Sequence, residues 1–169
     1  MQPGRRRYDP LNPPRWCVWR WRPINGDYRT GSDIETRHYL LRLYLLLTQS
    51  FSVCIHWVNF ADPDPDPHDH QRGFFSIVLR GWYREEVYPP SMAVERCVRV
   101  FPVRRTVHWW NWKPHGSVHR IVEVAPGTVT FVLHGKRRSD WHFYPKHRML
   151  NARVPVPWLD YTAGTVRQS

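Results

Sequence analysis

Two of the ten histidines in this 169-residue chain, His68 and His70, are separated by one residue at the end of an Asp-Pro repeat, in DPDPDPHDHQRG (62–73). Alternate residues of a β-strand point to the same face, so both imidazoles could bind one metal ion at adjacent coordination positions. A third ligand from another strand would complete one face of an octahedron and leave the other positions open for a substrate. His119, in the apolar segment SVHRIVEV (117–124), is the natural candidate for that ligand.

Other polar side chains could assist such a centre. His134, on the predicted strand GTVTFVLHG (127–135), could hydrogen-bond near the metal or transfer a proton. Lys136 and the two arginines after it could bind a phosphate or carboxylate, although a solvated turn is an equally good interpretation. Glu85 and Glu86 could bind a metal or orient a histidine, but the commoner expectation for them is a strand end that faces water.

The elements that must position these side chains are predicted to be β-strands. After residue 50, short apolar segments bounded by Pro or Gly recur about every ten residues, which is typical of a β-sandwich or barrel. The segment 31–47 could begin as a helix capped by Ser32 or Asp33, while its later part is also compatible with a strand. The predicted strands lie at 50–60, 73–88 (two strands around a turn at Gly81), 95–103, 106–112, 117–124, 127–135 and 139–145.

The net charge of +11 is concentrated at the two ends of the chain. Residues 1–30 hold seven Arg against two Asp, and residues 135–169 hold seven Lys or Arg against two Asp. Basic termini can bind nucleic acid or another polyanion, and Trp16, Trp19 and Trp21 could stack on bases. A solvated arginine-rich surface, with the tryptophans packed against the main domain, is the simpler interpretation.

Several classes of protein are not expected. No apolar run approaches the eighteen residues of a transmembrane helix, and the first residues lack the apolar segment of a signal peptide. The three cysteines, Cys17, Cys54 and Cys97, are odd in number and far apart, so they suggest neither a disulfide framework nor a cysteine zinc site. We expect a cytoplasmic protein with free thiols and no membrane association.

Two segments resemble the motifs of the cupin superfamily. HDHQRGFFSIVLRGWYREE (68–86) resembles the first cupin motif, and PHGSVHRIVEV (114–124) resembles the second. The resemblance implies an all-β double-stranded β-helix (a jelly-roll barrel), with residues 1–31 as an N-terminal extension, 32–150 as the cupin domain and 151–169 as a C-terminal tail. The position seven residues before Gly81, where the first motif has a glutamate ligand, is Phe74. The resemblance therefore implies a three-histidine site without a carboxylate.

This arrangement is similar to that of the cysteine (thiol) dioxygenases, which add O2 to a thiol on ferrous iron. The similarity implies Fe(II), O2 and a small anionic substrate, although Zn, Ni, Mn or Cu would also accept three imidazoles. It also implies that Arg42, at about the right distance upstream, binds the substrate carboxylate. Of the Ser-x-His-x-Tyr set in that family only His134 is kept, between Val132 and Lys136, so a thiol substrate is not implied.

The pair HDHQRGFFSIVLRGWYREE and HRIVEV…HGKRRSDWHF resembles more closely a group of uncharacterised bacterial and phage cupin-like proteins, which implies no activity. Three functions are compatible with the sequence. The first is a mononuclear iron oxygenase with His68, His70 and His119 as ligands, assisted by His134 and by Arg42 or Lys136. The second is a non-redox metal-dependent isomerase, epimerase or lyase. The third is a non-enzymatic module that binds nucleic acid or protein.

Overall fold

The computed structural model describes residues 16–17, 19–30, 33–89, 101–145, 155–157 and 160, and every element in this part of the chain is a β-strand. The prediction of an all-β protein is confirmed. Within the described residues, no helix is long and apolar enough to cross a membrane. The strands are β1 (Trp16–Cys17), β2 (Arg20–Thr30), β3 (Asp33–Thr48), β4 (Ser52–Val58), β5 (Phe74–Arg80), β6 (Tyr83–Tyr88), β7 (Val103–Val107), β8 (Trp110–Lys113), β9 (Val118–Val124), β10 (Thr128–His134), β11 (His142–Phe143) and β12 (Val156–Pro157).

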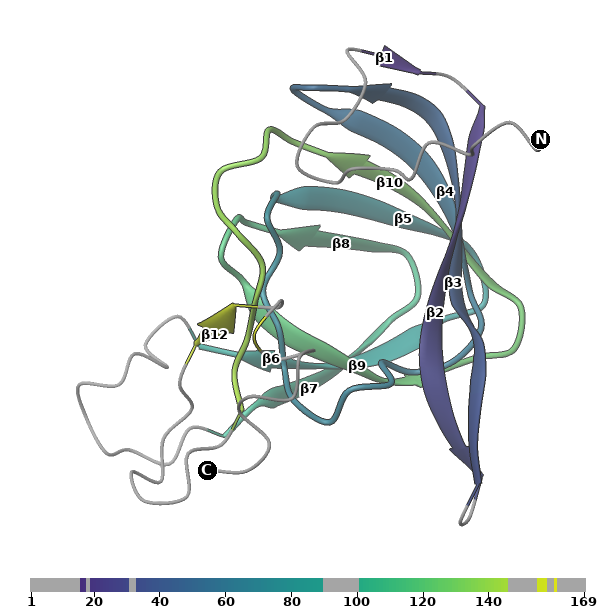
Figure 1. Ribbon diagram of the computed structural model, residues 1–169, viewed down its shortest axis with the longest axis vertical. Coiled ribbons are helices and arrows are strands. Elements are labelled where there is room, and N and C mark those ends of the chain that lie inside the picture. Colours follow the sequence, from purple (N-terminus) through teal and green to yellow (C-terminus); the bar gives the residue numbers. More distant parts are fainter. Residues whose placement is uncertain are drawn as a thin grey trace, which may run out of the picture.

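Eight segments pair in a nested order. β4 pairs with β10, the segment at His68 bridges to β9, β5 pairs with β8, and β6 pairs with β7. Each pair encloses the next along the chain, so the polypeptide forms one long antiparallel hairpin rolled into a barrel, which is the jelly-roll topology of the cupins. The larger sheet has the order β1-β3-β4-β10-β5-β8 with β2 beside β3, and the smaller has the order β7-β6-β9. Figure 1 shows the two sheets on opposite sides of the barrel.

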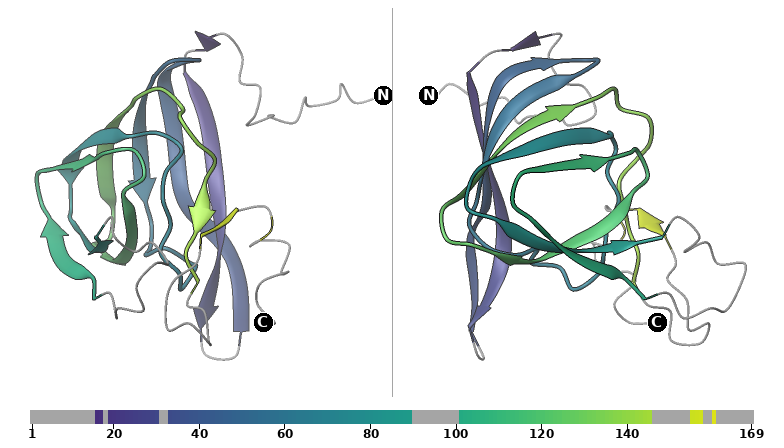
Figure 2. Two further views of the ribbon diagram at one scale, coloured as in Figure 1. Left: turned by 90° about the vertical axis from the view of Figure 1, so that its left-hand side faces the viewer. Right: turned by 180° about the vertical axis from the view of Figure 1, so that it is seen from behind.

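The segment 31–47, which could have begun as a helix, forms β3 from Asp33 onward, so the helix alternative is wrong for the described residues. β3 pairs with β2 along one edge and with β4 along the other, and these two ladders satisfy the backbone groups that a helix would have satisfied internally. The β2–β3 hairpin is longer than the other strands and projects beyond the barrel (Figure 2). Residues 20–30 of the predicted extension thus continue the larger sheet.

Parts of the predicted organisation fall on residues outside the described ones. These are the first half of the N-terminal extension, the start of the predicted strand 95–103 with Cys97, and most of the tail 151–169. The division of the chain into an extension, a domain and a tail stays a prediction.

The barrel interior is polar on the side of the larger sheet. Side chains of β4 alternate, and Ser52, Cys54, His56 and Val58 are its buried members. The apolar core is correspondingly divided into small clusters, of which one contains Val132 and another Val78. Buried polar side chains lower stability unless they are paired, so a barrel interior that contains several of them is a candidate functional site.

Candidate metal centre

His68, His70 and His119 come together in the buried interior, beside the edge of the smaller sheet. His68 and His119 exchange backbone hydrogen bonds of 2.9 and 3.0 Å, which fix β9 beside the segment that follows the Asp-Pro repeat. The Nε2 atoms of His70 and His119 are 2.7 Å apart, and one nitrogen from each of the three rings lies within 4.8 Å of the others. Two imidazoles at right angles on a metal with bonds of about 2.0–2.1 Å would place their nitrogens about 3 Å apart, so the arrangement fits a shared ion.

Glu85 orients His119. The Nδ1–H of His119 donates a hydrogen bond of 2.8 Å to Glu85 Oε2, because a carboxylate can only accept, and this leaves the Nε2 lone pair directed toward His70. Glu85 is fully buried, so the expectation that it faces water at a strand end is wrong. The reason is its place in β6, the central strand of the smaller sheet, between β7 and β9. Carboxylates that fix a ligand histidine in this way are common around protein metals.

The Glu85 carboxylate is held by a buried network. Its oxygens accept hydrogen bonds from Arg105 Nε (2.6 Å) and Asn111 Nδ2 (3.1 Å), and Lys113 Nζ lies 3.0 Å from Oε2. Burial alone would raise the pKa of Glu85, but the hydrogen bond and charge of His119, together with Lys113, lower it to about 2. Lys113 is 2 % exposed, and burial lowers its pKa while Glu85 opposes that shift. Glu85 is therefore ionised at neutral pH.

His68 is positioned by the Asp-Pro repeat. The Asp62 carboxylate is buried and accepts hydrogen bonds from the backbone N–H of Ile121 (2.7 Å) and from the Tyr39 hydroxyl. The Oδ2 atom of Asp62 lies 3.8 Å from His68 Nδ1, a buried nitrogen with no hydrogen-bond partner among the described residues. The first aspartate of the repeat thus fixes the loop and lies beside a ligand candidate.

The two histidines of the HxH motif are neutral at pH 7. Burial lowers the pKa of His68 to about 4 against the opposing effect of Asp62, and burial followed by the charge of His119 lowers that of His70 well below its usual value. A neutral imidazole has a free lone pair, so a metal would displace no proton from these rings. The donor set and the spacing of the three histidines both fit a divalent transition metal.

Aromatic side chains surround the three histidines. The Phe74 ring lies 4.9 Å from His70 and 6.3 Å from His119 between ring centroids, so it stands beside the two nitrogens that face each other. Trp141 and Phe143 pack against His68 at 5.8 and 5.6 Å. These rings limit the access of water to the site.

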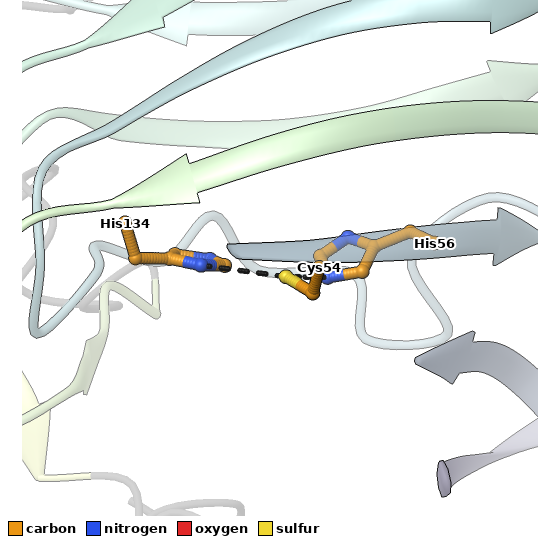
Figure 3. A group of neighbouring side chains, drawn as sticks. All are labelled: Cys54, His56 and His134. Carbon is orange, nitrogen blue, oxygen red and sulfur yellow. Dashed lines mark hydrogen bonds between the residues drawn. The ribbon is translucent and has the colours of Figure 1, made fainter. Parts of the chain in front are cut away.

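A second polar group lies on the other side of Phe74. Figure 3 shows Cys54 and His56 of β4 with His134 of β10. Cys54 Sγ is 3.2 Å from His56 Nε2 and 3.6 Å from His134 Nδ1. The Phe74 ring is 5.8 Å from that of His134, so a single aromatic side chain separates this group from the three-histidine group.

Arg42 decides whether this second group is better suited to a metal ion or to an anion. Its Nε donates a hydrogen bond of 2.7 Å to His56 Nε2, and its Nη1 donates one of 3.0 Å to the Tyr44 hydroxyl. The first bond uses the lone pair that a metal would need, and the guanidinium puts a positive charge beside it. The spacing of Cys54, His56 and His134 would otherwise suit a metal, but the arginine makes this group better suited to an anion.

The protonation states in the second group agree with that conclusion. Burial, then Arg42, lowers the pKa of His134 to about 3, and burial with Arg42 and His134 lowers that of His56 well below its usual value. Burial raises the pKa of Cys54 to about 11, partly offset by Arg42. At neutral pH the guanidinium is therefore accompanied by neutral imidazoles and a protonated thiol.

Of the three residues predicted to assist the metal centre, two lie in the barrel interior and one lies on the surface. Arg42 and His134 face the interior in one polar group, whereas Lys136 is exposed in the segment after β10. Sequence reasoning missed His56 and Cys54, although the alternating pattern of SVCIHWV (52–58) carried a signal. It also missed Lys113, because no local pattern marks this residue and its burial depends on the pairing of β8 with β5.

No known family profile matches the sequence, and no curated protein matches it. The structure is similar to an RmlC-like cupin from Shewanella frigidimarina NCIMB 400 (13 % identity, TM-score 0.39, covering 68 % of this chain and 86 % of that one). It is also similar to oxalate decarboxylase from Bacillus subtilis (11 %, 0.44, 85 % and 34 %) and to Fe(II)-HppE (14 %, 0.42, 66 % and 55 %). The chain thus spans about a third of the decarboxylase and about half of HppE. The nested strand order of this chain, and not these similarities, identifies the jelly roll.

Proposed function

We propose that this protein is a metal-dependent enzyme in which His68, His70 and His119 hold one divalent metal, with ferrous iron as the first choice. The observation that carries the proposal is the position of His119, whose Nδ1–H is fixed by buried Glu85 so that its Nε2 faces that of His70 at 2.7 Å. An imidazole bound to a metal carries no charge, so three histidine ligands would leave the full charge of the metal available to an anionic substrate atom. Zn, Ni, Mn and Cu are compatible with the same ligands.

We further propose that the reaction is the oxygenation of a small anionic substrate. Ferrous iron, when bound, would supply the site at which O2 is reduced, and the electrons would come from the substrate, which would be oxidised as it takes up the oxygen atoms. The chain itself would attract the anionic group by the positive charge of Arg42, whose Nε and Nη1 already donate to His56 and Tyr44, on the far side of Phe74 from the histidines. The ring of His134 could accept a proton from the substrate once the negative charge of the bound substrate raises the lowered pKa of the ring, and the Phe74 side chain would keep water from the space between the two groups.

A non-redox reaction is the second candidate, because one observation favours it. The rings of His56 and His134 lie 5.9 Å apart, both neutral and both near Arg42. An anion bound by Arg42 would thus lie near two groups able to move protons, which is what an isomerase, epimerase or lyase needs. Polyanion binding by the basic termini remains a separate prediction that neither reaction requires.

Metal analysis of the purified full chain tests the proposal. We expect about one equivalent of iron per chain in protein produced with a mixture of transition metals, and its loss in His119→Ala. His108→Ala is the matched control, because His108 is an exposed histidine on another part of the barrel. O2 consumption with a panel of small carboxylates, thiols and enols then identifies the reaction class. Stoichiometric zinc or nickel without O2 uptake would support the non-redox candidate, and wild-type protein that binds no metal would refute both.

A further inference from the structure

Three arginines share one face of the β2–β3 pair, at the edge of the larger sheet. Arg22 of β2 is directly opposite Arg42 of β3, and Arg20 is opposite Tyr44, two positions along β3 from Arg42. On antiparallel strands, directly opposite side chains have Cβ atoms about 4.5–5.5 Å apart, and diagonal neighbours are about 7–8 Å apart. We name Arg20, Arg22 and Arg42 the arginine row, whose three guanidinium groups can reach one small ligand.

The arginine row lies on the inner face of the sheet. Trp21, between the two arginines of β2, packs its ring 5.3 Å from that of Trp57 of β4. Trp57 alternates with the buried residues of β4 and therefore points outward. Trp21 thus points outward as well, so Arg20 and Arg22 point to the inner face. On that face the third member of the row donates a hydrogen bond to the second polar group.

This arrangement is unfavourable without a counter-charge. Like charges directly opposite on neighbouring strands destabilise a sheet, and the side chains of Arg22 and Arg42 are only partly exposed, which limits screening. Asp62, which shares the neighbour Tyr39 with Arg42, already accepts hydrogen bonds from that tyrosine and from a backbone N–H. Neither Asp nor Glu occupies the adjoining inward positions, all of which the structure describes: β3 (40, 44, 47), β4 (52, 54, 56, 58) and β10 (128, 130, 132, 134).

The number of arginines indicates the chemical class of the anion. A carboxylate has one negative charge and two oxygens, which the fork of a single guanidinium can satisfy. A phosphate monoester carries a charge of about −1.5 to −2 at pH 7 and has three strongly accepting oxygens. Three guanidinium groups therefore match a phosphate group both in charge and in the number of acceptors.

We propose that the arginine row binds the phosphate group of a small phosphate monoester. The inference rests on the proposed function only in taking this molecule to be the substrate, whose remaining part would extend past Phe74 toward the three histidines. Arg20 and Arg22 belong to neither polar group of the barrel interior, so they would hold the ligand without touching the reacting atoms.

Calorimetric titration of the purified full chain, with and without added chelator, tests the proposal. Glycerol 3-phosphate should bind at least about 10-fold more tightly than glycerate, which has a carboxylate in place of the phosphate ester. Arg20→Gln and Arg22→Gln should each weaken binding of glycerol 3-phosphate by about 10-fold or more, because each removes a charge-assisted hydrogen bond. Arg104→Gln is the matched control: it removes the same charge from a side chain that is 71 % exposed on the smaller sheet, and affinity should stay within about two-fold.

Thermal unfolding separates a binding role from a structural one. Without ligand, Arg22→Gln should raise Tm because it removes the like-charge pair, although the same variant binds glycerol 3-phosphate more weakly. A lower Tm together with weaker binding would indicate a merely structural role and overturn the proposal.

Other outcomes also contradict the proposal. These are no binding of glycerol 3-phosphate by the wild type, equal or tighter binding of glycerate, and an equal loss in Arg104→Gln. A loss confined to Arg138→Gln would assign the anion to the segment after β10 instead. A chain that binds glycerol 3-phosphate but no metal would refute the proposed function and leave the arginine row as a phosphate site.

Discussion

The Glu85 carboxylate positions His119 and also neutralises buried Lys113, and replacement of Glu85 by Gln should affect both metal affinity and stability. Glutamine can still accept the hydrogen bond from His119 Nδ1, but it removes the negative charge that Lys113 and Arg105 share. Loss of a carboxylate partner behind a ligand histidine typically weakens metal binding by about 10- to 100-fold, or about 1.4–2.7 kcal/mol. Lys113 is also left in the interior without its counter-charge, and breaking a buried ion pair from one side costs about 3–5 kcal/mol of stability.

A second substitution distinguishes these effects. In Glu85→Gln/Lys113→Met the unpaired ammonium is gone, so stability of the metal-free protein in urea should recover by a few kcal/mol, on the order of the loss from the single change. Metal affinity, measured by competition with a chromophoric chelator, should not recover, because the charge behind His119 is still absent. The two measurements therefore respond to different parts of the network.

The neighbouring residue is the matched control. Glu86 is also buried, but it is paired with Arg104 and Arg120 and contacts no ligand candidate. Glu86→Gln should cost stability and leave metal affinity within about two-fold of the wild type. If Glu85→Gln binds metal as the wild type does, or if both variants lose the same affinity, the assignment of Glu85 as a positioning residue fails.

Three further outcomes follow from the structure. Phe74→Glu should destabilise the metal-free protein yet bind metal more tightly than Phe74→Gln, as measured by metal-dependent shifts in Tm; equal shifts would place residue 74 away from the ion. Burial and then a nearby carboxylate raise the pKa of Tyr83 from 10.0 to about 12, so the neutral phenol is favoured in the fold. About 3 kcal/mol of stability should be present below pH 10 and lost as the pH rises through 12, and Tyr83→Phe should flatten that part of a urea-unfolding pH series. Gly81 and Gly116 share a φ of 77°, but a Cβ at Gly81 would collide with Thr128 whereas one at Gly116 meets open space. Gly81→Ala should therefore lower stability by clearly more than Gly116→Ala, which carries only about 1–2 kcal/mol of backbone strain, and similar losses would show that the collision is relieved cheaply.

The candidate ligands could be predicted from the sequence, whereas the residues and strands that position them could not. The ligand candidates were found because their signals are local: HxH two residues apart, one histidine in a later strand, and a phenylalanine where a carboxylate was expected. Glu85 was misjudged because its burial depends on the pairing of β6 with β7 and β9, which no local pattern specifies. The start of β3 was ambiguous for the same reason, since its conformation there is decided by the ladder with β2.

The Asp-Pro repeat, although low in sequence complexity, positions the first ligand candidate, His68. Each aspartate before a proline is directed toward an extended backbone, which suits a loop that must reach the barrel without joining a sheet. In the structure the repeat is held at its first residue by Asp62 and at its last by the Pro67 carbonyl, which accepts from the backbone N–H of Tyr144 at 2.9 Å. His68 follows directly, so two fixed ends determine the position of the first ligand candidate.

The balance of charge in the interior constrains what the site can accept. Arg42 and Lys113 are cations beside or within the barrel interior, and a divalent metal bound by three imidazoles would add two more positive charges. The buried carboxylates of Glu85, Asp62 and Asp69 offset three of these four charges, and each already accepts hydrogen bonds from the chain. Excess positive charge in a poorly hydrated space is costly until an anion enters. The same argument favours an anionic substrate, and a molecule with a negative group at each end would neutralise the charge of the metal and the charge of Arg42 at once.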